Sequence, residues 1–111
     1  MIVAYVPDLM DRSKITAAAP EPVRFVALPA DLAAAVADAD LVLVDLARPG
    51  AIEAVGDMTV LPTRRVVGFA PHLDHQRLDE ARAAGCTEVL ARRDLFRRLD
   101  EVLANPAPRG P

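Results

Sequence analysis

Short apolar runs alternate with longer amphipathic stretches along this chain, and the alternation predicts a regular series of strands and helices. Strands are expected where Val, Leu and Ile gather in short runs, at Met1–Val6, Val23–Leu28, Leu41–Val44, Arg64–Ala70 and Thr87–Ala91. Helices are expected over the stretches that follow, at Leu9–Ala19, Leu32–Ala39, Ala51–Val55, Leu73–Ala84 and from Asp94 onward. The pattern therefore predicts five strand–helix units.

The third apolar run, Leu41–Val44, has no polar interruption, which is typical of a strand buried on both faces of a parallel sheet. Strands that alternate with helices through short connections predict a doubly wound parallel α/β sheet covered by helices on both faces. The units fill residues 1–104 as one domain. The remaining segment, 105–111, is rich in proline and is expected to be a flexible C-terminal tail.

Polar residues at the expected helix ends support these assignments. Asp8, Asp31 and Asp94 stand where an N-cap is expected, and Gly85 stands where a helix would stop. Asp11 falls in a first helical turn, where a carboxylate favours the helix dipole. The inward face of the last helix is indicated by apolar residues at helical spacing, namely Leu95, Leu99, Val102 and Leu103.

Composition and charge narrow the class of protein. The chain has 111 residues, of which 52% are apolar, so it can bury a core. Its net charge of -3 argues against nucleic acid as a partner. No apolar run approaches the ~18 residues of a membrane span, so no membrane partner is expected. The lone Cys86 excludes an internal disulfide and is expected to be a small buried residue, which predicts a cytoplasmic protein.

Asp45 is the main candidate for chemistry. It ends the apolar run of the third strand, and a turn at Pro49-Gly50 follows. In open α/β sheets, ligands and reactive groups collect where the strands end at their carboxyl side. We therefore expect Asp45 to emerge at the functional edge of the sheet.

The segment LVLVDLARPG, placed at the third of five units, resembles the pattern around the phospho-accepting aspartate of response-regulator receiver domains. The segment Ala83–Leu90 is similar to the receiver approach to the fifth strand. The resemblance covers nearly the whole chain and implies a flavodoxin-like three-layer α/β/α fold with strand order 2-1-3-4-5. It also implies that Asp45 holds the phospho-acceptor position and that Asp8 and Asp45 are the remaining ligands of a weak Mg²⁺ site.

Three departures from the receiver pattern point to lost phosphorylation chemistry. Pro7 replaces one residue of the acidic pair, Phe69 or Ala70 replaces the switch hydroxyl, and Arg92 replaces the lysine after the fifth strand. An arginine fork is not interchangeable with a lysine ammonium. Asp11 lies one turn further on and could lean back toward the metal, but the helix-dipole role is favoured. The departures predict a pseudo-receiver in which Asp45 caps the third helix or pairs with Arg92.

Two functions follow from the resemblance. The favoured hypothesis is a non-enzymatic signalling module that needs no cofactor and binds a protein partner, or a second copy, through its last strand and helix. The surface expected for that contact consists of Arg93, Arg97 and Arg98 with Leu95. The alternative is an atypical single-domain response regulator that takes a phosphoryl group on Asp45 with Mg²⁺. An enzyme is disfavoured because the chain has no glycine-rich phosphate loop and its only serine is Ser13.

The segment PHLDH holds a further polar cluster before the fourth helix. His72, Asp74 and His75 invite a metal interpretation, but their spacing supplies at most two ligands with ease and no third ligand is near in sequence. The favoured interpretation is that His72 or Asp74 begins the helix.

Overall fold

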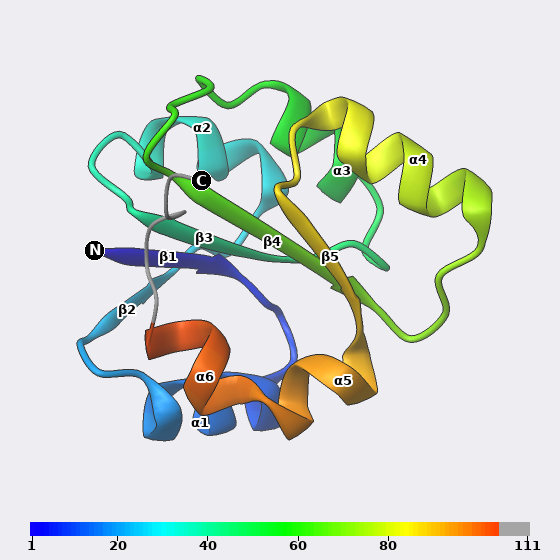
Figure 1. The fold of residues 1–111 in the computed structure, drawn as a ribbon. Helices are drawn as coiled ribbons and strands as arrows, with labels where there is room; N and C mark the ends of the chain where they lie inside the picture. Colours follow the sequence, from blue (N-terminus) through cyan, green and yellow to red (C-terminus); the bar gives the residue numbers. More distant parts are fainter. Residues whose placement is uncertain (105–111) are drawn as a thin grey trace.

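One five-stranded parallel sheet forms the centre of the molecule (Figure 1). The computed structural model describes residues 1–104. The strands are ordered β2-β1-β3-β4-β5, which confirms the flavodoxin-like topology predicted from the sequence. Their bounds are β1 Ile2–Tyr5, β2 Val23–Phe25, β3 Leu41–Asp45, β4 Arg65–Ala70 and β5 Glu88–Ala91. All neighbouring pairs run parallel.

Helices cover both faces of this sheet, which confirms the three-layer arrangement (Figure 1). One face carries α2 (Leu32–Ala35), α3 (Ala51–Gly56) and α4 (His75–Ala84). The other face carries the remaining helices, α1 (Leu9–Ala18), α5 (Arg92–Arg97) and α6 (Leu99–Ala104). Each layer closes its own apolar core, so alternate side chains of the central strands serve opposite cores.

The central strand β3 is buried along its whole length, as its unbroken apolar sequence predicts. Val42 and Val44 face the core under α2 and α3, whereas Leu41 and Leu43 face the core under α1 and α6. The register places Asp45 opposite Phe69 of β4. Val44 is paired on both sides, with Tyr5 of β1 and Gly68 of β4, and Asp45 is then held by β4 alone at the carboxyl edge of the sheet.

The Leu46 side chain packs closely against Gly68, and this contact directs the chain after β3. A Cβ atom on Gly68 would come within 2.6 Å of Leu46 Cδ1 and 3.1 Å of Cys86 Sγ. Only glycine therefore lets the Leu46 side chain lie flat over β4. The turn is completed at Gly50, whose φ of +80° falls in the left-handed region that favours glycine.

Two helical predictions differ from the structure. The second helix is shorter than predicted, because Pro29 starts a 3₁₀ turn over Pro29–Asp31 that leads into α2. Asp31 stands at the N-cap position of α2, as predicted, but it has helical dihedrals and its side chain makes no capping hydrogen bond. The residues Val36–Ala39, predicted as helix, lie beyond the end of α2.

The last predicted helix is divided in two. It begins at Arg92 rather than after Asp94, so Asp94 is not its N-cap, and it is interrupted at Arg98 between α5 and α6. The apolar face was predicted correctly, since the four residues expected to point inward are all buried: Leu95, Leu99, Val102 and Leu103. The proposed tail, 105–111, lies outside the described residues.

The other helix ends agree with the sequence. Asp8 caps α1 by accepting a hydrogen bond from the Asp11 N–H, and Asp74 caps α4 by accepting one from the Arg77 N–H. Gly85 ends α4 with a φ of +127°. Within residues 1–104, no helix combines the length and the apolar character that crossing a membrane would need.

Candidate functional site

Charged side chains from three separate units meet at the carboxyl edge of the sheet. Asp8 and Asp11 stand at the start of α1 directly after β1, Asp45 ends β3, and Arg92 begins α5 directly after β5. Parallel strands bring their carboxyl ends to one edge, so residues far apart in the sequence are gathered there. This edge is the position at which the sequence predicted a functional site.

The strongest contact at this edge joins Asp11 to Arg92. The Nη1 and Nη2 atoms of Arg92 donate to the two carboxylate oxygens of Asp11. The Asp11 side chain is only 1% exposed, whereas that of Arg92 is 37% exposed. The guanidinium also lies over the ring of Phe96, with Cζ 4.8 Å from the ring centroid. The pair therefore joins α1 to α5 through a carboxylate that solvent does not reach.

The electrostatics of Arg92 follow from this environment. The hydrogen bonds to Asp11 raise the pKa of the Arg92 guanidinium, with smaller contributions from the charges of Asp11, Asp8 and Asp45. A guanidinium is always protonated in proteins, so Arg92 supplies a permanent positive charge to the acidic edge.

Asp11 has a second role besides its predicted place in the first helical turn. It does lie in the first turn of α1, where a carboxylate favours the helix dipole, but its side chain is buried on the same face as Ile15. Residues four apart share one helix face, and here that face points into the molecule. Asp11 thereby accepts hydrogen bonds from Nη1 and Nη2 of Arg92, and Arg92 pairs with Asp11 rather than with Asp45, its predicted partner.

Asp45 is held by its own turn instead. Its Oδ1 accepts a hydrogen bond from the Ala47 N–H at 3.1 Å, and its Oδ2 accepts one from Arg48 Nε at 3.3 Å. The predicted alternative that Asp45 caps the third helix is also wrong, because Gly50 occupies the N-cap of α3. Asp45 is 6% exposed, and Arg48 covers it from the solvent side with a side chain that is itself 43% exposed.

Asp8 is exposed and engaged by the backbone. Its Oδ1 accepts a hydrogen bond from the Asp11 N–H at 3.0 Å. This bond is the main cause of the lowered pKa of the Asp8 carboxyl, and the charges of Arg92 and Arg48 add to it. Asp8 therefore works as a helix cap whose carboxylate form is favoured.

The carboxylates at this edge all have hydrogen-bond partners within the protein. Mg²⁺ requires near-octahedral oxygen ligands at short distances. Asp11 gives both oxygens to Arg92, Asp45 gives both to its turn, and Asp8 gives one to the backbone. No group of three or more carboxylate, histidine or cysteine side chains among residues 1–104 is arranged to hold a metal ion.

The positions that correspond to the receiver switch are apolar and buried. Phe69 is fully buried and Ala70 nearly so, and neither offers a hydroxyl. The Phe69 ring meets Phe96 edge to face, with centroids 5.9 Å apart and an interplanar angle of 87°. Lys14 Nζ lies 5.5 Å from the Phe96 centroid. Aromatic packing thus occupies the space between β4 and α5.

The surface predicted for a partner is only partly exposed. Leu95 has no exposed surface and packs in the core, so its prediction as a surface contact is wrong. Arg97 is exposed and pairs with Asp94 within α5 at 2.8 Å, and Arg98, between α5 and α6, is exposed and pairs with Glu101 at 3.3 Å. Arg93 is exposed as well. Arg93 and Arg97 therefore lie on the exposed side of α5, Arg98 follows its end, and Leu95 packs the helix against the core.

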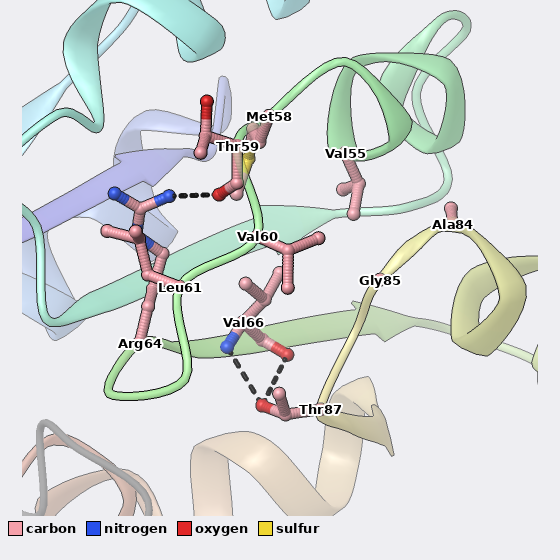
Figure 2. Close-up of a pocket in the computed structure, with 10 residues that line it drawn as sticks. All are labelled: Val55, Met58, Thr59, Val60, Leu61, Arg64, Val66, Ala84, Gly85 and Thr87. Carbon is pink, nitrogen blue, oxygen red and sulfur yellow. Dashed lines mark hydrogen bonds between the residues drawn. The ribbon is translucent and has the colours of Figure 1, made fainter.

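A small apolar pocket lies at the opposite edge of the sheet, between the loop before β4 and the turn before β5 (Figure 2). Its volume is about 40 Å³, and its polar lining is internally bonded. Arg64 Nη1 donates to the Thr59 carbonyl at 2.7 Å, and Thr87 Oγ1 bonds to both the N–H and the carbonyl of Val66 (Figure 2).

Cys86 and the polar cluster before α4 have structural roles. Cys86 is 7% exposed, which confirms that it is buried, and burial raises the pKa of its thiol to about 11. Of the polar cluster before α4, Asp74 is the helix cap, as the favoured interpretation held, while His72 and His75 are exposed.

Sequence reasoning missed three arginines that shape the molecule. Arg48 pairs with Asp45 three residues earlier, a spacing visible in the sequence. Arg77 Nη1 donates to the Leu46 carbonyl at 2.8 Å and so joins α4 to the turn after β3. Arg64, 3% exposed, binds carbonyl groups of distant loops, and no sequence signal marks such contacts. The burial of Asp11 could have been found from its spacing to Ile15.

The sequence matches no protein-family model and no curated protein. The fold is similar to that of solved response regulators. A response regulator from Thermotoga maritima aligns with a TM-score of 0.65 at 12% identity, over 93% of this chain and 96% of that chain. A response regulator in red light signaling of R. palustris aligns with a TM-score of 0.65 at 16% identity, over 98% of each chain. The chain thus has the fold of a receiver domain.

Proposed function

We propose that this protein is a receiver-like regulatory module that acts by contact with another protein and no longer uses phosphoryl transfer. The observation that carries the proposal is the bidentate pair between Arg92 and the buried Asp11. The response regulators that share the fold support a role in signalling. Because fold alone does not define function, the argument rests on the chemistry of the carboxyl edge.

The first step concerns charge. A receiver site gathers carboxylates, and their repulsion must be balanced by a cation. Here Arg92 provides a permanent positive charge, held on Asp11 and close enough to Asp8 and Asp45 for their charges to raise its pKa. The edge is therefore balanced by the protein itself, and we propose that it needs neither Mg²⁺ nor another cofactor.

The second step concerns the switch. Signalling by phosphorylation requires a group that follows the phosphoryl oxygen and then repacks a surface. Phe69 and Ala70 cannot donate a hydrogen bond from their side chains, and the Phe69 ring is fixed against Phe96. A module of this kind would present one surface constantly. We propose that it does not alternate between two states.

The third step concerns the partner. Three exposed arginines lie on α5 or directly after it, namely Arg93, Arg97 and Arg98. Arg97 and Arg98 pair with Asp94 and Glu101 on this surface, so Arg93 is the arginine here without an ion pair among residues 1–104. We propose that this surface binds an acidic face on a protein partner or on a second copy of the chain. Such contacts gain specificity and association rate from charge complementarity. The proposal includes no catalytic step.

The test is exposure to acetyl phosphate with Mg²⁺, followed by the intact mass of the protein. We expect no added phosphoryl group in the wild type and the same result for Asp45→Asn, which serves as the control. A mass increase in the wild type that is absent from Asp45→Asn would overturn the proposal. That outcome would establish the alternative, an atypical response regulator phosphorylated on Asp45 with Mg²⁺.

A further inference from the structure

A polar cleft between α3 and α4 lies beside the turn that follows β3, on the side of Asp45 away from Arg92. The two helices pack against each other over the same face of the sheet (Figure 1). The cleft has a volume of about 340 Å³, which is within the range of small-ligand sites. Its lining is mainly polar, in contrast to the small apolar pocket at the other edge of the sheet (Figure 2).

Two arginines line this cleft and retain donors for a ligand. Arg48 donates from Nε to Asp45, and Arg77 donates from Nη1 to the Leu46 carbonyl. Within residues 1–104 these are the only side-chain hydrogen bonds of the two guanidinium groups. Each group carries five N–H donors, so several remain available on both. Guanidinium donors match the planar geometry of a carboxylate.

Two glutamates line the same cleft. Glu53 comes from the first turn of α3, and Glu80 comes from α4, where its Oε1 accepts a hydrogen bond from Gln76. In the part of the chain that the structure describes, neither glutamate forms an ion pair with Arg48 or Arg77. The cleft therefore presents two arginines and two glutamates that do not form ion pairs with each other.

The fold holds the two arginines of the cleft in position. Arg77 binds the Leu46 carbonyl, and the Leu46 side chain rests on Gly68, so α4 and the turn after β3 keep a fixed separation. Gly50 completes the turn with its positive φ. The arginine donors are thus presented by two packed elements rather than by a free loop, which lowers the ordering cost of binding.

We propose that this cleft binds a small zwitterion of the amino-acid type. The carboxylate of the ligand would accept hydrogen bonds from Arg48 and Arg77, and its ammonium would face Glu53 and Glu80. A ligand with only one charged group would leave one half of this lining without a partner. The proposal concerns a different site from the Asp11–Arg92 pair and does not depend on the proposed function.

The test uses L-glutamine, whose neutral side chain leaves recognition to its two charged groups. Its analogues N-acetyl-L-glutamine, without the ammonium, and L-glutaminamide, without the carboxylate, serve as controls. Amide chemical shifts of the labelled full chain are followed during titration. We expect shifts in the turn after β3 and in α3 and α4, with glutamine binding about threefold more tightly than either analogue.

Substitutions of single residues test which side chains of the cleft bind the carboxylate and which bind the ammonium. We expect Arg48→Gln to remove the preference over glutaminamide and Glu53→Gln to remove the preference over the acetylated form. Arg82→Gln, an exposed change on α4 outside the lining, should keep both preferences. The proposal is overturned if cleft residues do not shift at about 10 mM ligand. It is also overturned if the three ligands bind equally, or if Arg82→Gln weakens binding as much as the cleft variants.

Discussion

Arginine side chains join distant segments at both edges of the sheet, but the two edges differ in which charged group is buried. At the amino edge, Arg64 donates to the carbonyls of Val36, Ala39 and Thr59, and Arg65 donates to Glu88 and to the Val102 carbonyl. At the carboxyl edge, Arg92 donates to the carboxylate of Asp11. At the amino edge the buried charged groups are arginines, which bind carbonyls and the half-exposed Glu88 carboxylate, whereas at the carboxyl edge the buried charged group is the Asp11 carboxylate.

The comparison explains why the carboxyl edge is the more specific feature. Carbonyl groups are polar but uncharged, and Arg64 joins the separate segments that carry its carbonyl partners. A carboxylate that is only 1% exposed is stable in the folded state only with a charged partner. The Arg92 contact therefore both holds α5 against α1 and neutralises the buried Asp11 charge, whereas the Arg64 contacts only hold loops in place.

The largest effect is expected from Arg92→Ala. The substitution leaves the Asp11 carboxylate buried without its partner, which we expect to lower the free energy of unfolding by about 3 kcal/mol. Urea unfolding at neutral pH measures it. Arg93→Ala, at the neighbouring exposed position, is the control and should change little. The double variant Asp11→Ala/Arg92→Ala should be no less stable than Arg92→Ala. An equal effect of the two arginine variants would contradict the central role of the pair.

A smaller effect is expected from Arg64→Ala. The change leaves the buried Ala39 carbonyl without its donor and frees the loop that carries Thr59, at a cost of about 2 kcal/mol. The Val36 carbonyl loses one donor but keeps its hydrogen bond from the Ala39 N–H. Hydrogen exchange should accelerate in the loop before β4, and Arg82→Ala on the surface provides the baseline. A second substitution that removes a carboxylate should not restore the stability lost in Arg64→Ala. Restoration by such a change would erase the distinction between the two edges.

A third, still smaller effect is expected from Arg48→Ala. Its pair with Asp45 is long at 3.3 Å, and the Arg48 side chain is 43% exposed, so the loss should be about 0.5 kcal/mol. Asp45 keeps its hydrogen bond from the Ala47 N–H in this variant. Thermal unfolding with high and low salt measures the difference. A loss as large as that of Arg92→Ala would mean that Asp45, and not Asp11, is the main charged acceptor at this edge.

Cys86 tests the amino side of β5 without any substitution. Burial raises the pKa of its thiol to about 11, so little thiolate is present in the folded protein at pH 8. Alkylation by iodoacetamide should therefore be slow in the native state and fast in denaturant, because the thiolate is the reactive form. The rate should rise as the pH approaches the raised pKa. Fast alkylation of the native protein near neutral pH would show that this side is open.

Much of the fold could be predicted from the sequence because the strands are short apolar runs between clear turn residues. The run Leu41–Val44 marks the centre of the sheet, and the predicted strand order was confirmed. The errors fall where local signals compete. Pro29 imposed its fixed φ and began a 3₁₀ turn before the predicted cap at Asp31. The break at Arg98 has no signal that we can identify.

The site was harder to predict because it depends on pairs that are distant in sequence. Asp45, Asp8 and Arg92 were correctly placed at the carboxyl edge by the order of the units. Which carboxylate Arg92 binds depends on how α1 rotates over the sheet, and that rotation is set by packing around Ile15. The inward face of α1 can be predicted from the sequence only if a polar residue such as Asp11 is accepted as part of that face.

The most direct test of the account is the response of the amide spectrum to beryllofluoride with Mg²⁺, a mimic of the phosphoryl group. The account predicts that resonances of Asp45, Phe69 and Arg92 stay in place, because Arg92 already balances the carboxyl edge through Asp11. Shifts of these resonances in the wild type that disappear in Asp45→Asn would contradict it.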